Sequence, residues 1–91
     1  MIKINDVDYY NEILNDEESK ILYFSSAWCF PCMKTNLIMA YLNTNIKIYK
    51  IDIDKLNLKN KVVPSVEIHF DNNKIRIIGY EMIKENINRY I

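Results

Sequence analysis

The sequence predicts an α/β domain in which helices cover both faces of a mixed sheet. Strand-like and helix-like patterns alternate through residues 1–54, which is typical of parallel strands joined by right-handed crossovers. Residues 63–79 then hold two strand-like segments joined by a short turn, which predicts an antiparallel hairpin. The chain has 91 residues and no internal repeat or Pro/Gly-rich linker, so we expect residues 1–91 to form a single domain with one modest core.

The first three segments follow clear periodicities. Residues 1–5, MIKIN, alternate apolar and polar side chains and predict a short strand. Residues 6–15 predict a helix, with Asp6 placed to cap its N-terminus. The apolar residues of this helix recur at helical spacing: Val7, Tyr10, Ile13 and Leu14. Residues 20–25, KILYFS, form an almost continuous apolar run that suits a strand at the centre of the sheet.

The middle of the chain predicts a second helix and a third strand. Residues 33–43 predict a helix. Five apolar side chains are expected on one face of it: Met33, Leu37, Ile38, Tyr41 and Leu42. Residues 46–54, IKIYKIDID, predict a strand whose alternation shifts phase at Tyr49–Lys50, as a β-bulge would cause. Residues 55–62 are too short and polar for a full helix, so we expect a loop with at most a turn or two.

The last third predicts the hairpin and a closing helix. Residues 63–70 and 74–79 predict two strands joined by a three-residue turn, DNN, at positions 71–73. Residues 80–91 predict an amphipathic helix. Its inward residues are expected to be Met82 or Ile83, together with Ile87, Tyr90 and Ile91. The predicted order of elements is therefore βαβαβ followed by ββα.

Composition and charge exclude several classes of function. Twelve basic and 12 acidic residues give a net charge of zero, whereas a nucleic-acid-binding domain normally carries a basic excess. The longest apolar runs, such as ILYF at 21–24, are far shorter than the roughly 20 residues that cross a bilayer. The N-terminus carries acidic residues where a secretory signal would be basic and then apolar. We expect a cytoplasmic, monomeric protein that binds neither nucleic acid nor membrane.

Both cysteines of the protein, Cys29 and Cys32, lie within the stretch SSAWCFPCMK. A structural zinc site needs four ligands, and the only histidine, His69, lies on a different predicted strand, so one chain cannot complete a Cys/His site without a carboxylate or a second copy. An inert disulfide is a further alternative, although a reducing compartment disfavours it and so small a loop gains little stability. A C-x-x-C pair near alternating strand and helix patterns in a reducing compartment is more often redox-active or metal-binding.

The placement of the pair predicts different roles for the two thiols. If Cys29 lies at the start of the following helix, unpaired backbone N–H groups and the helix dipole lower its pKa below the ordinary value of about 8.5. Pro31 suits a first-turn position, where no hydrogen bond is lost. Cys32, one turn further on, lies close enough for a disulfide and is more sheltered. We therefore expect Cys29 to attack and Cys32 to resolve the mixed disulfide, which is thiol–disulfide exchange.

With these motifs the sequence resembles the thioredoxin superfamily, whose members carry Trp-Cys-x-x-Cys between a central strand and a long helix. Residues 23–32, YFSSAWCFPC, are especially similar to the active-site stretch of tryparedoxins and nucleoredoxins. Residues 50–54, KIDID, residues 62–70, VVPSVEIHF, and Gly79 match further family segments in the same order. The resemblance covers nearly the whole chain and implies a thioredoxin fold with a shortened third helix.

The resemblance also implies a role for each residue of the site. Cys29 would be the nucleophile and Cys32 the resolving thiol. Trp28 would shield the pair and form part of the docking surface. Pro64 would follow a cis peptide bond and lie against the disulfide, and the Val63 backbone would pair with an incoming polypeptide as an added strand.

The sequence departs from the family pattern at two places in the site. Tyr23 occupies the position where thioredoxins bury an aspartate, and we expect it to serve mainly in packing, while Lys50 is expected to act electrostatically near the pair. Phe30 places a bulky apolar side chain between the cysteines, where thioredoxins have glycine, and is expected to contact substrate. Asp52 and Asp54 are expected to lie on a solvated strand edge.

The sequence thus predicts a protein-disulfide reductase that needs no bound cofactor and no metal. Its partners would be disulfide-containing proteins and, for recycling, a thioredoxin-reductase-like enzyme or glutathione. One alternative is a glutaredoxin-like, glutathione-dependent reductase, although residues 77–84, IIGYEMIK, lack the Gly-Gly segment of glutaredoxins. The other is a non-enzymatic binding module or cluster carrier that uses Trp28, Phe30 and Val63 as a docking patch.

Overall fold

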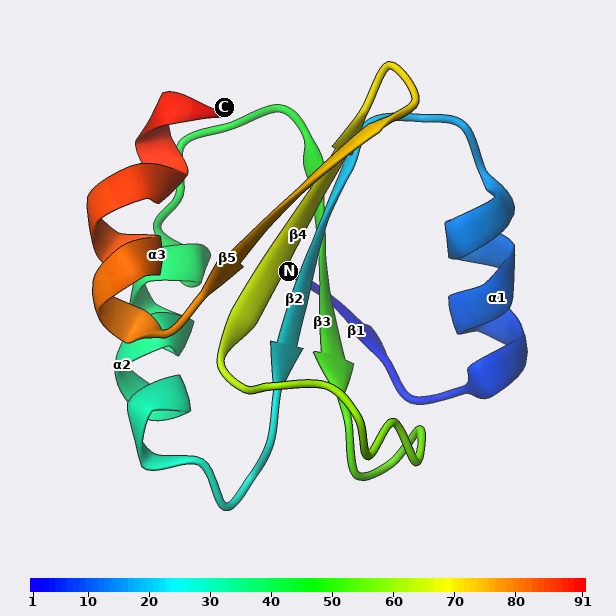
Figure 1. The fold of residues 1–91 in the computed structure, drawn as a ribbon. Coiled ribbons are helices and arrows are strands. Elements are labelled where there is room, and N and C mark those ends of the chain that lie inside the picture. Colours follow the sequence, from blue (N-terminus) through cyan, green and yellow to red (C-terminus); the bar gives the residue numbers. More distant parts are fainter.

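A computed structural model describes residues 1–91 and shows a central sheet with helices on both faces (Figure 1). In chain order the elements are β1 (Ile2–Ile4), α1 (Val7–Asn15), β2 (Lys20–Ser25), α2 (Phe30–Ala40), β3 (Lys47–Asp52), β4 (Ser65–Phe70), β5 (Asn73–Ile78), α3 (Tyr80–Asn86) and a 3₁₀ turn, η1 (Ile87–Arg89). This order confirms the predicted βαβαβ–ββα arrangement.

The sheet has five strands in the order β1-β3-β2-β4-β5, with β2 at its centre. Strands β1, β3 and β2 run parallel, whereas β4 runs antiparallel to β2 and β5 antiparallel to β4, which confirms the predicted mixed sheet. Because β2 and β4 are antiparallel, the end of β2 lies beside the start of β4, with Phe24 opposite Ser65. The loop that carries Cys29 therefore begins close to Pro64, which precedes β4.

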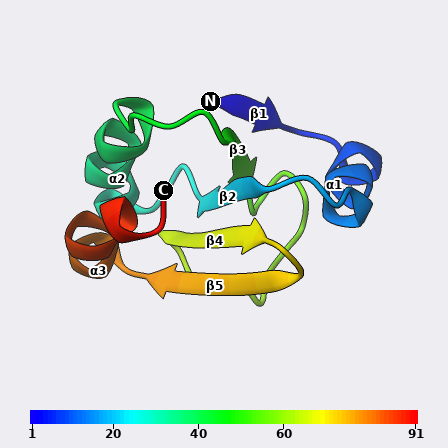
Figure 2. The same ribbon diagram turned by 90° about the horizontal axis from the view of Figure 1, so that it is seen from above.

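Two apolar clusters fill the space between the sheet and its helices. Figure 2 shows α1 on one side of the sheet and α2 with α3 on the other. On β2, Leu22 and Phe24 join the cluster beneath α1, while Ile21 and Tyr23 join the cluster beneath α2 and α3. This alternation explains the continuous apolar run of β2, because both of its faces are covered.

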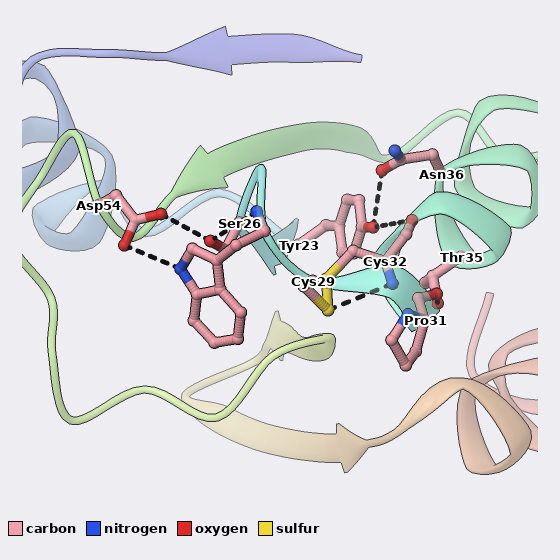
Figure 3. Close-up of a disulfide and its surroundings, with 9 residues drawn as sticks. Tyr23, Ser26, Cys29, Pro31, Cys32, Thr35, Asn36 and Asp54 are labelled. Atoms are coloured by element: carbon pink, nitrogen blue, oxygen red, sulfur yellow. Dashed lines mark hydrogen bonds between the residues drawn. A yellow bond between two sulfur atoms is a disulfide. The ribbon is translucent and has the colours of Figure 1, made fainter.

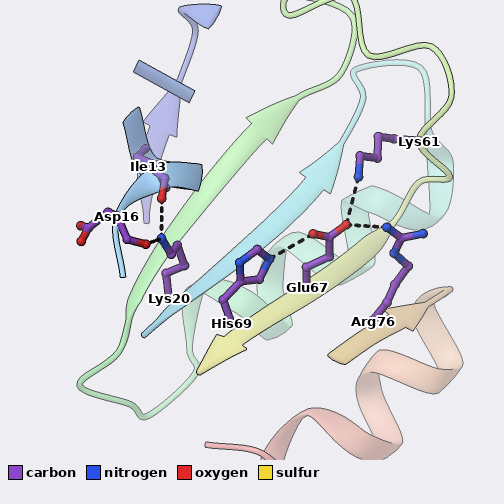
Figure 4. A network of polar contacts seen from close by, with 7 residues as sticks. All are labelled: Ile13, Asp16, Lys20, Lys61, Glu67, His69 and Arg76. Atoms are coloured by element: carbon purple, nitrogen blue, oxygen red, sulfur yellow. Dashed lines mark hydrogen bonds and ion pairs between the residues drawn. The ribbon is translucent and has the colours of Figure 1, made fainter. Parts of the chain in front are cut away.

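Polar groups fix both ends of α1. The side chain of Asp6 accepts the N–H of Asp8 at 3.0 Å, which confirms the predicted N-cap. At the other end the buried Lys20 of β2 donates to the carbonyl oxygens of Ile13 and Asp16 (Figure 4). An ammonium group at this end also complements the helix dipole. Tyr10 and Ile13 are the buried residues of α1.

The predicted inner face of the second helix is correct at Ile38 and Leu42, which pack against the cluster beneath α2 and α3, and wrong at its other three residues. Met33, Leu37 and Tyr41 are exposed by 63%, 63% and 84%. The residues that α2 buries are instead Cys32, Thr35 and Met39. The helix is rotated in this way because Cys32 is bonded to Cys29 and its carbonyl oxygen is held by the Tyr23 hydroxyl from β2. With Cys32 turned inward, a stripe that begins at Met33 faces outward.

Two local predictions in the sheet are also wrong. Strand β3 pairs with β2 in continuous register, so the phase shift at Tyr49–Lys50 is not a bulge. Ile48 packs on the α2 side and Tyr49 on the α1 side, because β3 is covered on both faces. The β4–β5 turn has two residues rather than three, Asp71 with φ 46° and Asn72 with φ 65°. Asp and Asn adopt such left-handed backbone more readily than other side chains.

The C-terminal helix is shorter than predicted. It ends at Asn86 and continues as η1, burying Ile83 and Ile87, whereas Met82, Tyr90 and Ile91 are exposed. Gly79 precedes it with φ +90°, a backbone conformation that other residues rarely adopt. Residues 53–64 contain turns but no helix, as predicted. The longest helix has 11 residues, and none has the length and apolar character needed to span a bilayer.

Candidate functional site

The two cysteines form a disulfide at the N-terminus of α2, with their Cα atoms 5.2 Å apart (Figure 3). Cys29 is the N-cap residue, with φ −87° and ψ 108°, and its Sγ accepts the N–H of Cys32 at 3.2 Å. Pro31 lies in the first turn, where it removes no helical hydrogen bond. The predicted placement of the pair at a helix start is thus what the structure has, with α2 beginning at Phe30 rather than Met33.

This placement favours negative charge on the sulfur of Cys29 once the disulfide opens. The N–H of Cys32 already points at that sulfur, and the unpaired amides of a helix N-terminus carry partial positive charge. Residues 30–40 of α2 include one charged side chain, Lys34, and no carboxylate that would oppose this field. Both cysteines are buried, Cys29 with 4% and Cys32 with 1% of its surface exposed, so the difference between them is the backbone N–H that the sulfur of Cys29 accepts.

Tyr23 lies beneath the pair and holds the first turn of α2 (Figure 3). It is fully buried, and its hydroxyl is 3.1 Å from the carbonyl oxygen of Cys32 and 2.7 Å from Oδ1 of Asn36. Burial raises the pKa of the Tyr23 phenol far above its ordinary value. The phenol therefore stays protonated and serves as a hydrogen-bond donor to the helix.

Trp28 is anchored by two residues that the sequence analysis did not assign to the site, Ser26 and Asp54. The indole Nε1–H donates to Oδ1 of Asp54 at 3.2 Å, and the Ser26 hydroxyl donates to Oδ2 of the same carboxylate at 2.6 Å (Figure 3). The Trp28 side chain is nevertheless 70% exposed beside the disulfide. Asp54 is exposed, as expected, but it follows the end of β3 and its carboxylate also binds Trp28 and Ser26. The KIDID stretch was the available signal, since Asp54 is its last residue.

On one side of Cys29 and Cys32 lies an apolar groove of about 450 Å³. Phe30, Pro31, Val63 and Pro64 line it together with residues of the β5–α3 junction, including Tyr80. The Val63–Pro64 peptide bond is cis, as expected, and the carbonyl oxygen of Pro64 accepts the N–H of Gly79 at 2.9 Å. Phe30 is 71% exposed at the rim of the groove. Segments distant in sequence thus meet in one apolar surface.

On the other side lies a more polar cavity of about 210 Å³, which both cysteines line. Lys50 and Asp52 of β3 also line it. Two carboxylate contacts of Asp52 are local, because its Oδ1 accepts the N–H groups of Asp54 and Lys55 at 2.9 and 3.2 Å. Asp52 thus stabilises the turn after β3. Lys50 lines the same cavity as the two cysteines, which agrees with its predicted location near the pair.

His69 lies away from the cysteines. It is on β4, where its Nε2 is 3.1 Å from Oε1 of Glu67. No group of three His, Cys, Asp or Glu side chains lies close enough together to hold a metal ion.

Comparison with known proteins establishes the fold. No family model matches the chain. Among solved structures, oxidised thioredoxin O2 from Arabidopsis thaliana is similar with a TM-score of 0.80 at 22% identity, covering 98% of this chain and 92% of that chain. Oxidised thioredoxin from Plasmodium falciparum gives 0.76 at 17% identity, covering 99% and 97%. Fasciola hepatica thioredoxin gives 0.74 at 17% identity, with 100% of both chains covered. This chain has the thioredoxin fold.

Within the thioredoxin fold, the structure brings together most of the residues that the sequence analysis singled out. Both cysteines line the polar cavity, and the two residues between them, Phe30 and Pro31, line the apolar groove. Of the predicted site residues, the groove is lined by Phe30, Pro31, Val63 and Pro64. The cavity is also lined by Lys50. Tyr23 donates a hydrogen bond to the α2 backbone at Cys32, and Trp28 donates one to Asp54. Residues 53–64, where the resemblance implied a shortened helix, form only turns.

Proposed function

We propose that the protein is a thiol–disulfide oxidoreductase that reduces disulfide bonds in other proteins. The observation that carries the proposal is the Cys29–Cys32 disulfide at the N-terminus of α2, where the sulfur of Cys29 accepts a backbone N–H. This arrangement would let the Cys29–Cys32 pair alternate between a dithiol and a disulfide. The thioredoxin fold agrees with this chemistry.

The reaction would proceed in two exchanges from the reduced protein. The Cys29 thiolate attacks one sulfur of the substrate disulfide, forms a mixed disulfide and releases the other substrate sulfur as a thiolate, which takes up a proton. The Cys32 thiol then loses its proton and attacks Sγ of Cys29, which releases the second substrate thiol. Two electrons and two protons pass to the substrate, and the Cys29–Cys32 disulfide is left on the protein. Lys50 in the polar cavity would stabilise the transient charge on Cys32.

The apolar groove would receive the substrate polypeptide. Phe30, Val63 and Pro64 give it apolar walls, and Trp28 adds an exposed aromatic ring held at Asp54. A segment lying beside Val63 in extended conformation would pair with its backbone, as in strand addition. The two partners of the reaction would then be a disulfide-containing protein in the groove and, afterwards, a reductant that reopens Cys29–Cys32.

Recycling is proposed to use a thioredoxin-reductase-like enzyme or glutathione, in a reducing compartment such as the cytoplasm. The cysteines supply all the redox chemistry of the two exchanges, so no resident cofactor enters the scheme. Measuring turnover with glutathione and its reductase against turnover with thioredoxin reductase separates the two routes.

The test is reduction of insulin, followed by the turbidity of its released chain, with the wild type, Cys29→Ser and Cys32→Ser. Cys29→Ser should abolish activity because no nucleophile remains, and Cys32→Ser should accumulate a mixed disulfide visible by mass spectrometry. Ser19→Ala is a control that removes an exposed hydroxyl outside the site and leaves both thiols and the Trp28 contacts unchanged. Equal rates for wild type and Cys29→Ser would refute the proposal and favour a binding module that uses Trp28 and Phe30.

A further inference from the structure

The segment between β3 and β4 ends at the cis Val63–Pro64 bond, although it contains no helix that would hold this turn in place. Leu56 is buried in the cluster beneath α1, and Leu58 and Val63 pack against that cluster from its edge. Lys61 is the only residue of positions 53–64 that forms an ion pair. Asp54 holds the start of this segment through hydrogen bonds to Trp28 and Ser26, so Lys61 is the ionic anchor of the part that leads to the cis bond.

Lys61 reaches across the turn to β4 (Figure 4). Its Nζ lies 3.0 Å from Oε2 of Glu67 and 4.7 Å from the centre of the Phe24 ring on β2. Lys61 lies two positions before Val63, and Glu67 lies three positions after Pro64. The ion pair therefore closes a short loop of chain whose middle is the cis peptide bond.

Glu67 is a strong acceptor because it is charged and buried. Its side chain is only 3% exposed, and it accepts hydrogen bonds from Lys61, Arg76 and His69. Burial alone would raise the pKa of Glu67, but the hydrogen bonds from His69, Lys61 and Arg76 lower it to about 2. The carboxylate stays ionised, so releasing Lys61 from it costs both a charge-assisted hydrogen bond and part of the compensation for burial.

We propose that Lys61, through its ion pair with Glu67, positions the Val63–Pro64 turn so that the turn can receive a substrate polypeptide. Lys61 is thus a positioning residue that acts through the turn and does not touch the sulfurs. The inference rests on the proposed reductase function for its kinetic readout. The position of the turn can also be measured without that function. The Pro64 carbonyl accepts the N–H of Gly79 at 2.9 Å, so this hydrogen bond depends on where the turn lies.

The protein contains a matched control for Lys61. Arg76 of β5 donates to the same oxygen of Glu67, Oε2, at 2.9 Å, but it lies outside the segment that carries Val63 and Pro64. Lys61→Met and Arg76→Met each remove one cation from that oxygen and leave two donors on the carboxylate. Met keeps most of the aliphatic length of both side chains, including the contact of position 61 with Phe24. Only the first substitution frees the turn.

The experiment compares kcat and KM for insulin with the rate for a small aromatic disulfide, dithiobis(nitrobenzoate), which needs no strand pairing. Lys61→Met should raise KM for insulin about fivefold, equivalent to about 1 kcal/mol, and leave the small-disulfide rate within about twofold. Arg76→Met should change neither by more than about twofold, and Lys61→Arg should restore KM because it keeps the charge. Equal KM changes for Lys61→Met and Arg76→Met, or equal slowing of both substrates by Lys61→Met, would overturn the inference.

Amide hydrogen exchange at Gly79 gives a readout that is independent of catalysis. Exchange should accelerate in Lys61→Met and not in Arg76→Met, and unchanged exchange in Lys61→Met would overturn the inference even if insulin is reduced normally. If the wild type does not reduce insulin, the proposed function fails while the Gly79 measurement still decides the role of Lys61. If Lys61→Met does not fold, Lys61→Gln makes the same comparison, because it also removes the positive charge of the ion pair.

Discussion

The buried Glu67 carboxylate should make the stability of the protein depend on pH, and replacing Glu67 with glutamine isolates its contribution. Glutamine has nearly the shape of a protonated glutamic acid, so Glu67→Gln mimics the acid form at every pH. In the folded protein, hydrogen bonds from His69, Lys61 and Arg76 outweigh burial and lower the pKa of Glu67 from its ordinary value of 4.5 to about 2. The folded state therefore binds this proton less tightly than the unfolded chain does.

The sign and size of the effect follow from this difference in proton affinity. Because the pKa is lower in the folded state, ionised Glu67 stabilises the fold fully above about pH 4.5, and this stabilisation is lost as the pH falls toward 2. Each tenfold change in proton affinity is worth about 1.4 kcal/mol, so the contribution at neutral pH is about 3 kcal/mol. That is a large share of the roughly 5–15 kcal/mol by which small domains are stable.

The assay is urea unfolding of wild type and Glu67→Gln between pH 2 and pH 7, followed by the fluorescence of Trp28, the only tryptophan. The wild type should be more stable than the variant by about 3 kcal/mol at pH 7, and this gap should close as the pH approaches 2. The other carboxylates titrate in both proteins, so the gap reports Glu67 alone. A gap that stays constant with pH, or one below about 0.5 kcal/mol at pH 7, would refute this account of the network.

Three further substitutions test the site and the fold. Tyr23→Phe removes the donor to the α2 backbone and should lower the free energy of unfolding by about 1 kcal/mol. The pH profile of insulin reduction should stay unchanged, because the phenol does not titrate in that range. A displaced profile would assign the hydroxyl a part in proton transfer. Asp54→Ala removes the acceptor of the Trp28 indole and should shift the fluorescence emission of the folded protein, an outcome that identical spectra would exclude. Asn72→Val places a β-branched residue at φ 65° and should destabilise the protein by about 1–2 kcal/mol. The control Asn73→Val lies in β5 and should be nearly neutral. Equal effects of the two substitutions on urea unfolding would contradict the two-residue turn.

The amino-acid sequence determined by itself what depends on neighbours along the chain. The order of strands and helices, the Asp6 cap and the hairpin between β4 and β5 all follow from periodicity, capping and turn residues within a few positions. The location of Cys29 and Cys32 at the start of a helix follows in the same way, because a local apolar run precedes them and Pro31 fits a first turn. The resemblance in the C-x-x-C stretch and at Pro64 then carried the prediction from local structure to the thioredoxin fold.

Only the tertiary structure decided how distant segments meet. The rotation of α2, which exposes Met33, is set by the bond of Cys32 to Cys29 and by the Tyr23 hydroxyl, and the hydrophobic pattern of the helix does not contain that information. The carboxylate of Asp54 finds the Trp28 indole because the strands that lead to both residues, β3 and β2, are parallel neighbours and end at the same edge of the sheet. The two cations that bind Glu67 likewise come from separate segments, Arg76 from β5 and Lys61 from the turn before β4. Such partners are fixed by strand pairing across the sheet, so a sequence pattern of period two or 3.6 carries no record of them.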